Sequence, residues 1–288
     1  MKPEIWDERS CLIGEGPVAL GADNSTVLWV DILEKKVLSK NFLTGEIGEF
    51  DTAEDVGFVI PRSNGGYILG TANGPILQDP DGTEHLLPTR IAVDGAEGKN
   101  PMRWNDAKVA PDGHLFLGSM TYEELPGEGA LYRLDKTATS MERLVSNVTV
   151  SNGLGWNRAG DKFFYIDTYS FGVDQFDYHD GKISNRTPVW RRSSESDGYP
   201  DGMCMDADDG LWIAFWGGSC LRHLDKDFNL VEVIDFPVPN VSSCAFAGPE
   251  LDHLIVTTAR RGTSDSQSGK TFILKPGVTG LATTLFPG

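Results

Sequence analysis

The chain has 288 residues, of which 40% are hydrophobic, and its formal net charge is −17 at pH 7. A negative field of this size repels phosphate backbones and anionic lipids, so we expect neither a nucleic-acid partner nor a membrane partner. The first twelve residues lack the basic start and apolar run of a signal peptide, and no segment is apolar over enough residues to cross a bilayer. The four cysteines are scattered without a CxxC pair. These features together predict a cytoplasmic protein with reduced thiols.

A short apolar strand pattern recurs six times along the chain. The six segments start 39 to 48 residues apart and are Leu28–Ile32, Tyr67–Thr71, Leu115–Ser119, Phe163–Asp167, Leu211–Phe215 and Leu254–Thr258. A repeat of this length is typical of propellers and solenoids, and four short strands per repeat without a helical period favour the propeller. We therefore predict one all-β domain over residues 1–288, a six-bladed β-propeller with four antiparallel strands per blade.

The third repeat shows the predicted blade most clearly. Its first strand is expected over Asn105–Ala110, and the Pro-Asp-Gly sequence that follows is a turn signal before the second strand. The third and fourth strands are expected over Gly129–Leu134 and Met141–Val145. At the N-terminus, Glu4–Trp6 is expected to pair with strands near the C-terminus, because closing the ring in this way removes an exposed sheet edge.

Strand direction predicts which face of the propeller carries the function. If the first strand of each blade starts at the top face, the loops that follow the second strands also lie there. Two of these loops, Met120–Glu128 and Arg260–Gly269, are longer than the hairpin turns expected on the opposite face. Since long polar loops are where binding and catalytic sites usually lie, the top face is the predicted functional face.

Four polar residues occupy matched positions near the starts of four first strands. Glu15, Asn105, Asn152 and Asp201 precede their second strands by 13, 10, 11 and 10 residues, so we expect them to meet at the top of the central channel. Two carboxylates close together are costly unless a cation or a proton relieves them, and carboxylate and amide oxygens are the ligands of hard divalent cations. The cluster therefore predicts a metal site. The alternative is that each residue caps a turn of its own blade.

Other residues near the predicted cluster are candidates for substrate contact. Arg103 lies two residues before Asn105, so the two side chains share one face of the strand. Because a metal cation would repel the guanidinium, we expect Arg103 to contact the substrate rather than the ion. The alternative is a surface salt bridge to an acidic neighbour. Tyr199 stands in the same relation to the aspartate of the cluster. Glu123, in the third-blade loop, can reach over the channel or be one of several solvated acids. Trp216 can stack on a ring or pack between blades.

Motifs from near the start of the chain to near its end match one known family. They are Gly14–Pro17, Arg103–Asp106, Ser151–Leu154, Phe163–Asp167, Ile183–Arg186, Pro200–Cys204 and Thr257–Arg260. On these residues the chain resembles the gluconolactonase, regucalcin (senescence marker protein) and luciferin-regenerating enzyme family. Trp104 stands where members of this family can have Phe or Pro, and this leaves the choice of substrate open.

The resemblance implies a six-bladed propeller that binds one divalent cation. Glu15, Asn152 and Asp201 match the family's metal ligands, whereas Arg103 and Asn105 match residues that touch the substrate or water at the metal. Glu123 matches a glutamate that contacts the substrate. The family mostly hydrolyses aldonolactones, and some of its members act on organophosphates or are described as calcium regulators.

The expected function is metal-dependent hydrolysis of a sugar lactone to an aldonic acid, by a monomer or weak homo-oligomer whose partner is the small-molecule lactone. The cation would polarise the lactone carbonyl, Asp201 is the candidate general base, Asn105 would orient water or the carbonyl, and Arg103 and Glu123 would hold sugar hydroxyls. We expect Ca²⁺ as the ion, with Zn²⁺, Mg²⁺ or Mn²⁺ also accepted, because no thiolate or imidazole selects a softer metal. The alternatives are a phosphotriesterase-like hydrolase and a non-enzymatic calcium-binding propeller.

Overall fold

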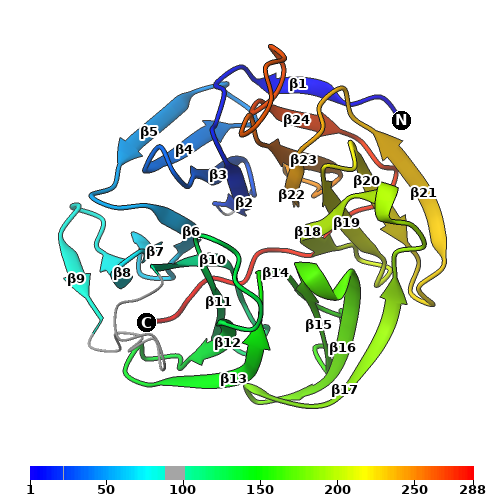
Figure 1. Cartoon of the computed structure of the whole chain (residues 1–288). Coiled ribbons are helices and arrows are strands. Elements are labelled where there is room, and N and C mark those ends of the chain that lie inside the picture. Colours follow the sequence, from blue (N-terminus) through cyan, green and yellow to red (C-terminus); the bar gives the residue numbers. More distant parts are fainter. Residues whose placement is uncertain (22, 88–100) are drawn as a thin grey trace.

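Six four-stranded antiparallel sheets surround a central axis in the computed structural model, which describes residues 1–21, 23–87 and 101–288 (Figure 1). The prediction of an all-β, six-bladed propeller is therefore confirmed. The only helical elements in the described residues are two 3₁₀ turns, η1 (Thr168–Ser170) and η2 (Glu195–Asp197). In that same part of the chain, no helix has the length and apolarity that crossing a membrane would require.

The blades follow one another along the chain, each with its first strand innermost. Blade 1 holds β2 (Gly14–Leu20), β3 (Thr26–Asp31), β4 (Lys36–Asn41) and β5 (Ile47–Asp51); blade 2 holds β6 (Val56–Pro61), β7 (Tyr67–Thr71), β8 (Gly74–Gln78) and β9 (Glu84–Leu86); blade 3 holds β10 (Met102–Val109), β11 (Leu115–Thr121), β12 (Gly129–Leu134) and β13 (Met141–Val148). Blade 4 holds β14 (Ser151–Trp156), β15 (Lys162–Asp167), β16 (Gly172–His179) and β17 (Lys182–Arg191); blade 5 holds β18 (Tyr199–Met205), β19 (Leu211–Trp216), β20 (Cys220–Leu224) and β21 (Leu230–Asp235); blade 6 holds β22 (Val241–Ala247), β23 (His253–Thr258), β24 (Thr271–Leu274) and β1 (Glu4–Asp7).

Blade 3 shows where the predicted strand bounds were too short. The strand β10 begins at Met102 rather than at Asn105, and β11 continues to Thr121, because Arg103 and Trp104 pair with Met120 and Ser119. Trp104 is only 2% exposed and lies edge-on to Phe58 of blade 2. Trp104 therefore belongs to the apolar core between blades 2 and 3.

Every innermost strand carries an irregularity in pairing close to its start. The register shifts in β2, β6, β10, β14, β18 and β22 fall between Glu15/Val18, Val56/Val59, Trp104/Ala107, Asn152/Leu154, Pro200/Met203 and Val241/Ser243. A β-bulge inserts an unpaired residue and re-aims the side chains beside it. The six bulges therefore lie at one height of the channel and are able to direct side chains into it rather than between blades.

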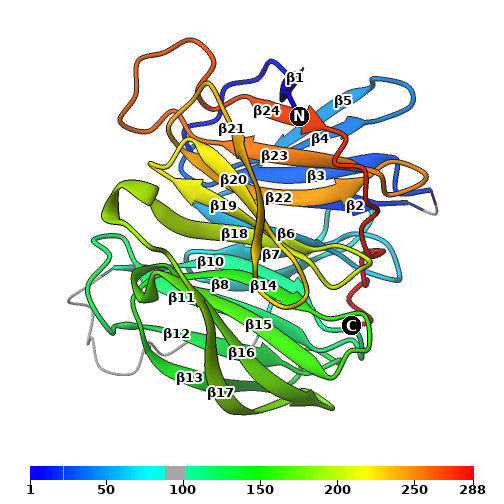
Figure 2. The same ribbon diagram turned by 90° about the vertical axis from the view of Figure 1, so that its right-hand side faces the viewer.

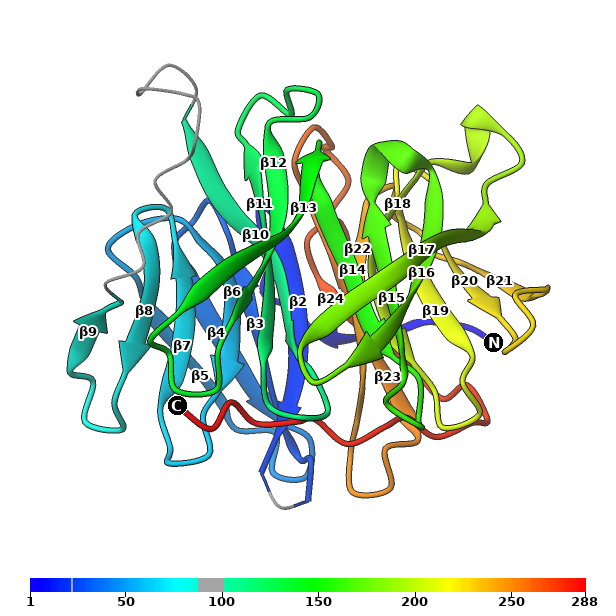
Figure 3. The same ribbon diagram turned by 90° about the horizontal axis from the view of Figure 1, so that it is seen from below.

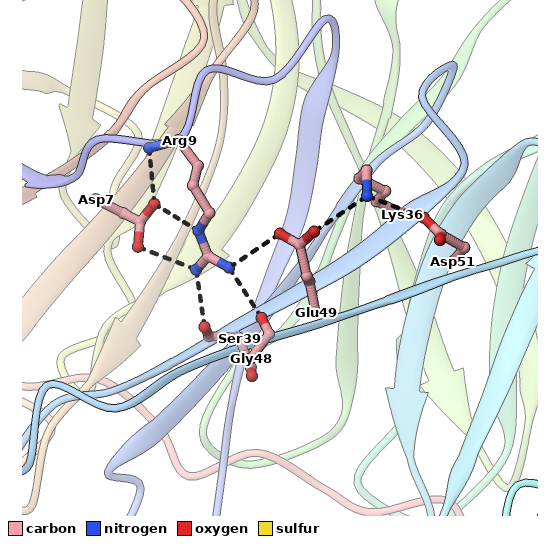
Figure 4. Close-up of polar contacts among 7 residues, drawn as sticks. All are labelled: Asp7, Arg9, Lys36, Ser39, Gly48, Glu49 and Asp51. Atoms are coloured by element: carbon pink, nitrogen blue, oxygen red, sulfur yellow. Dashed lines mark hydrogen bonds and ion pairs between the residues drawn. The ribbon is translucent and has the colours of Figure 1, made fainter.

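The ring is closed by the N-terminal strand, as predicted. In β1, Glu4 and Ile5 pair with Ile273 and Phe272 of β24, so the first and last strands of the chain share one blade (Figure 2). The turn after β1 is fixed by Arg9, whose guanidinium donates to both carboxylate oxygens of Asp7 and to two carbonyls of blade 1 (Figure 4). This contact ties blade 6 to blade 1 across the seam of the ring.

The C-terminal segment crosses one end of the propeller as a strap (Figure 3). Gly280 forms a bridge to Asp206 in blade 5, Phe286 forms a bridge to Arg62 in blade 2, and the Phe286 side chain is fully buried. The loops that follow the second strands stand at the other end in the same view. A ligand therefore reaches the channel from the loop end, which is the face predicted to be functional.

Candidate functional site

The four predicted cluster residues come together at the loop end of the channel. Glu15, Asn105, Asn152 and Asp201 lie beside the bulges of β2, β10, β14 and β18, and all four are buried, with exposed fractions between 4% and 8%. Asn105 Nδ2 donates to Asn152 Oδ1 at 2.7 Å, which joins blades 3 and 4 directly. The repeat spacing therefore brought residues from four blades to one place.

A chain of hydrogen bonds fixes the orientation of the two amides. Arg103 Nη1 donates to Asn105 Oδ1 at 2.5 Å, and Asn105 Nδ2 donates to Asn152 Oδ1 and to the Ser151 carbonyl, the latter at 2.9 Å. Asn152 Nδ2 donates to Thr168 Oγ1 at 2.8 Å, and that hydroxyl donates to the Pro200 carbonyl at 3.0 Å. Because its nitrogen is engaged by Thr168, Asn152 presents its oxygen to the cluster, and a carbonyl oxygen has a second lone pair for a cation.

The carboxylates of the site are held in a strongly unfavourable electrostatic environment. Burial, followed by repulsion from Asp106, raises the pKa of Glu15 to about 8, although Arg103 opposes the shift. Burial also raises the pKa of Asp201 well above its usual range, with further repulsion from Glu15 and Asp106. A divalent cation relieves this kind of repulsion, and the oxygens of two carboxylates and an oriented amide suit it chemically. The residues present therefore fit the metal that the sequence predicted, with Glu15, Asn152 and Asp201 as its candidate ligands.

Asp106 is a site residue that the sequence reasoning missed. It follows Asn105 directly, where the corresponding residues after Glu15, Asn152 and Asp201 are all glycines. Burial raises the pKa of Asp106 to about 6, and Lys108 partly opposes the shift. The signal was present in the repeat alignment, since an acid replaces the glycine of the other blades at one position only among these four.

The reason for two of the three glycines is the close approach of neighbouring strands. A Cβ on Gly202 would lie 2.2 Å from Ser243 Oγ of blade 6, and a Cβ on Gly153 would lie 2.9 Å from the Asp201 carbonyl of blade 5. Contacts below 3.0 Å are not tolerated without movement of a neighbour. Gly16 of blade 1 has open space around it but a φ of +57°, which L side chains rarely adopt. Blade 3 places a carboxylate at the matched position.

Arg103 lies behind the amides rather than out in solvent. It is 8% exposed, its Nη1 also donates to the Trp104 carbonyl at 3.0 Å, and its guanidinium lies 6.0 Å from the ring centre of Tyr122. Burial lowers the pKa of this guanidinium. The Tyr122 hydroxyl donates to Asp55 at 2.7 Å, so the wall of the site next to blade 2 is also braced.

The third-blade loop brings one of its three glutamates towards the site. Glu124 accepts a hydrogen bond of 2.8 Å from the Tyr169 hydroxyl, and its charge contributes to the raised pKa of Asp201. Glu123, the residue predicted to contact the substrate, is exposed on the same loop, and its role stays a prediction. Trp216 packs beside the apolar cluster of blades 1 and 2, which favours the inter-blade alternative for this residue.

A cavity of about 330 Å³ lies in the channel directly beneath the cluster. It is lined by the inner strands, including Gly16 and Asp106 next to the cluster, and is bounded at the far end by Leu281–Thr284 of the strap. The cavity and the strap therefore lie on the far side of the cluster from the loops, and we expect the reacting groups of a ligand to approach from the loop face.

A second group of possible metal ligands lies away from this site. Ligand atoms of Asp112, His114 and Asp180 lie within 4.8 Å of one another in the described part of the chain. They belong to the turns after β10 and β16, which are at the strap end of the propeller. Tyr178 donates to Asp112 at 2.7 Å and Lys136 lies 3.5 Å from Asp180, so protein groups already engage both acids. None of the predicted ligands is in this group.

Comparison with known proteins agrees with the resemblance seen in the motifs. The model of the family described as "SMP-30/Gluconolactonase/LRE-like region" matches residues 13–260. Regucalcin of Danio rerio is 36% identical over 255 residues, covering 87% of this chain and 84% of its own. Among solved structures, a luciferin-regenerating enzyme has a TM-score of 0.89 at 26% identity, covering 99% of this chain and 100% of its own. A calcium-binding protein, regucalcin, from Agrobacterium tumefaciens has a TM-score of 0.90 at 23% identity, covering 100% of this chain and 98% of its own, and so supports the fold. The chain therefore belongs to the SMP-30/gluconolactonase/LRE-like family.

Proposed function

We propose that the chain hydrolyses a sugar lactone to the corresponding aldonic acid with the help of one divalent cation. The observation that carries the proposal is the meeting of Glu15, Asp201 and an oriented Asn152 amide at the open end of the channel. Membership of a family whose description includes gluconolactonase supports the same reaction class. When bound by these three residues, the cation would polarise the carbonyl of the lactone and stabilise the charge that develops on its oxygen.

The remaining groups have tasks that follow from their geometry. Asp201 accepts a proton from the attacking water; burial gives its carboxylate a high affinity for protons, and a nearby cation would keep it ionised at neutral pH. Asn105 has both Nδ2 hydrogens engaged by Asn152 and Ser151, so the second lone pair of its Oδ1 is the group that would accept from the attacking water and orient it. Water adds to the carbonyl carbon and gives one proton to Asp201, the ring C–O bond breaks, and the ring oxygen takes up that proton to become a free hydroxyl. The new carboxylic acid loses a proton to solvent, which leaves the aldonate.

The ion that we propose first is Ca²⁺, with Mg²⁺, Mn²⁺ and Zn²⁺ as ions that also support activity. The candidate ligands are all oxygens, and such sites discriminate by cavity size and charge rather than by softness. The formal net charge of −17 also favours the binding of cations over anions.

The test is hydrolysis of a panel of five- and six-carbon aldonolactones, followed with a pH indicator, next to a fluorophosphate. We expect a sugar lactone to be hydrolysed far more efficiently than the fluorophosphate, and EDTA to remove the activity without unfolding the protein. Asp201→Asn should abolish hydrolysis with the fold intact, and activity above about 10% of wild type would exclude Asp201 as the base. A metal-loaded protein that is inert on every lactone would instead favour a calcium-binding propeller without catalysis.

A further inference from the structure

An exposed group of aromatic side chains stands at the mouth of the candidate site. Tyr169 and Tyr199 are 40% and 38% exposed, and their ring centres lie 5.7 Å apart. Phe171 completes the group, with ring centres 6.1 Å from Tyr169 and 5.8 Å from Tyr199. We call these three residues the aromatic platform. Among the described residues, Tyr169 and Tyr199 are the only aromatic side chains in the exposed class, so this region is unlike the rest of the surface.

The platform is tied directly to the residues of the metal site. Tyr169 follows Thr168, whose hydroxyl bridges the Asn152 amide and the Pro200 carbonyl. Tyr199 lies two residues before Asp201 on β18, a separation of about 7 Å along a strand. A ring stacked on the platform would therefore lie beside the reacting lactone ring and not on top of it.

The platform is also rigid and has polar groups at its edge. The guanidinium carbon of Arg192 lies 3.9 Å from the ring centre of Phe171 and 5.1 Å from that of Tyr199, which braces both rings from one side. Phe171 and Glu124 both have positive φ, 58° and 55°, which is an uncommon backbone state for residues with bulky side chains. Strain of this kind persists where the surrounding structure enforces it and is concentrated at ligand sites. Glu124 holds the Tyr169 hydroxyl at 2.8 Å and keeps free lone pairs on its carboxylate.

We propose that the aromatic platform binds a second sugar ring, so that the preferred substrate of this site is an aldonolactone carrying a glycosyl group. A pyranose has a C–H face that packs on aromatic rings and a rim of hydroxyls that donate to carboxylates, and the platform offers both surfaces side by side. An aryl substituent would use the rings but has no hydroxyl to donate to the remaining lone pairs of the Glu124 carboxylate. The inference rests on the proposed lactone hydrolysis for the reacting ring and adds the class of substituent.

The test compares glucono-1,5-lactone with cellobiono-1,5-lactone, which has the same reacting ring and one further glucose unit. We expect kcat/KM of the wild type to be about tenfold higher for the two-ring substrate, mainly through KM, since stacking contacts of this kind are worth up to about tenfold in binding. Tyr199→Ala and Tyr169→Ala should each reduce the ratio of the two kcat/KM values towards one. Tyr199→Phe, which keeps the ring, should retain most of it. Leu230→Ala, on the exposed outer strand β21, is the control and should leave the ratio unchanged.

A binding measurement separates failure of the platform from failure of the proposed reaction. Cellobionate, the product, is titrated into the wild type and into Tyr199→Ala by calorimetry, with gluconate as the one-ring reference. Tighter binding of cellobionate that is lost in Tyr199→Ala supports the platform even if no lactone is hydrolysed. Equal kcat/KM for the two lactones in the wild type overturns the platform while leaving the proposed function intact. A dimer that dissociates on Tyr199→Ala, with no preference for two-ring ligands, would show that a second protein chain covers these rings and would also overturn it.

Discussion

Replacing Thr168 by valine tests whether a hydrogen-bond bridge between two blades builds the metal site. The Thr168 hydroxyl accepts from Asn152 Nδ2 at 2.8 Å and donates to the Pro200 carbonyl at 3.0 Å, and the residue is 8% exposed. Valine has nearly the same shape but leaves both partners unsatisfied. A buried polar group without its partner costs about 1–3 kcal/mol, and we expect a total loss of stability of about 2–4 kcal/mol.

The same substitution should weaken metal binding, because it frees the Asn152 amide to turn its oxygen away. Loss of an outer partner of a metal ligand typically weakens affinity by about 10- to 100-fold. At an ion concentration 100 times the wild-type dissociation constant, binding stabilises the wild type by about 2.7 kcal/mol; a tenfold weaker variant would gain about 1.4 kcal/mol and a 100-fold weaker one about 0.4 kcal/mol.

The assay is calorimetric titration of the EDTA-treated protein with Ca²⁺ and Mn²⁺, next to urea unfolding with and without the ion. Thr168→Ser is the matched control, since it keeps the hydroxyl and loses one methyl group. We expect it to bind both ions within a few-fold of the wild type. If Thr168→Val binds them as tightly as Thr168→Ser, then Asn152 is not a ligand or its orientation does not depend on the bridge, and the reasoning is refuted.

Two further predictions concern the metal-free protein and the seam of the ring. Because the pKa of Glu15 in the folded protein is raised to about 8, the folded state binds the proton more tightly than the unfolded chain does. The free energy of unfolding in EDTA should therefore fall as pH rises from about 5 to about 8, by up to about 1.4 kcal/mol per pH unit. Urea unfolding should show this slope and Glu15→Gln should reduce it, whereas identical slopes in the two proteins would contradict the prediction. Arg9→Ala should lower the free energy of unfolding by about 2–3 kcal/mol, because it leaves the Asp7 side chain, only 3% exposed, without its cation. It also removes a guanidinium that lies 5.0 Å from the Trp29 ring centre. A loss below about 0.5 kcal/mol, measured by denaturant unfolding, would show that the seam does not depend on this residue.

The repeat made much of the fold predictable from the sequence. Each second strand is a short apolar run that recurs every 39 to 48 residues, and the structure has a strand at all six predicted segments, including β7 with the predicted bounds. The bounds of β10 were missed because the sequence pattern could not show that Trp104 packs against blade 2. That contact joins residues of different blades, and local strand signals carry no information about it.

The same spacing brought the cluster residues together, but it did not reveal how their side chains are oriented. Glu15, Asn152 and Asp201 are found at one height because each lies at a bulge of its own inner strand. The bridge through Thr168 could not be predicted, since this residue follows a second strand and meets Asn152 only when the blade is folded. Likewise, the hydrogen bond from the Tyr169 hydroxyl to Glu124 joins two loops of different blades, and no local motif announces it.

Asp106 shows that a site residue can be found where one blade departs from the residue type that the other blades share. In the three other blades of the cluster, the position after the polar residue is glycine, and the structure explains two of these by backbone or side-chain atoms of the next blade closer than 3.0 Å to any added Cβ. Glycine therefore follows the polar residue at three of these four positions, and the residue at the fourth is a carboxylic acid whose pKa burial raises to about 6. An acid in such a position destabilises the metal-free protein through repulsion with Glu15 and Asp201. Since core packing gives no reason to keep it, the physical argument favours a role in the charge balance of the loaded site, where a divalent cation offsets the three acids together.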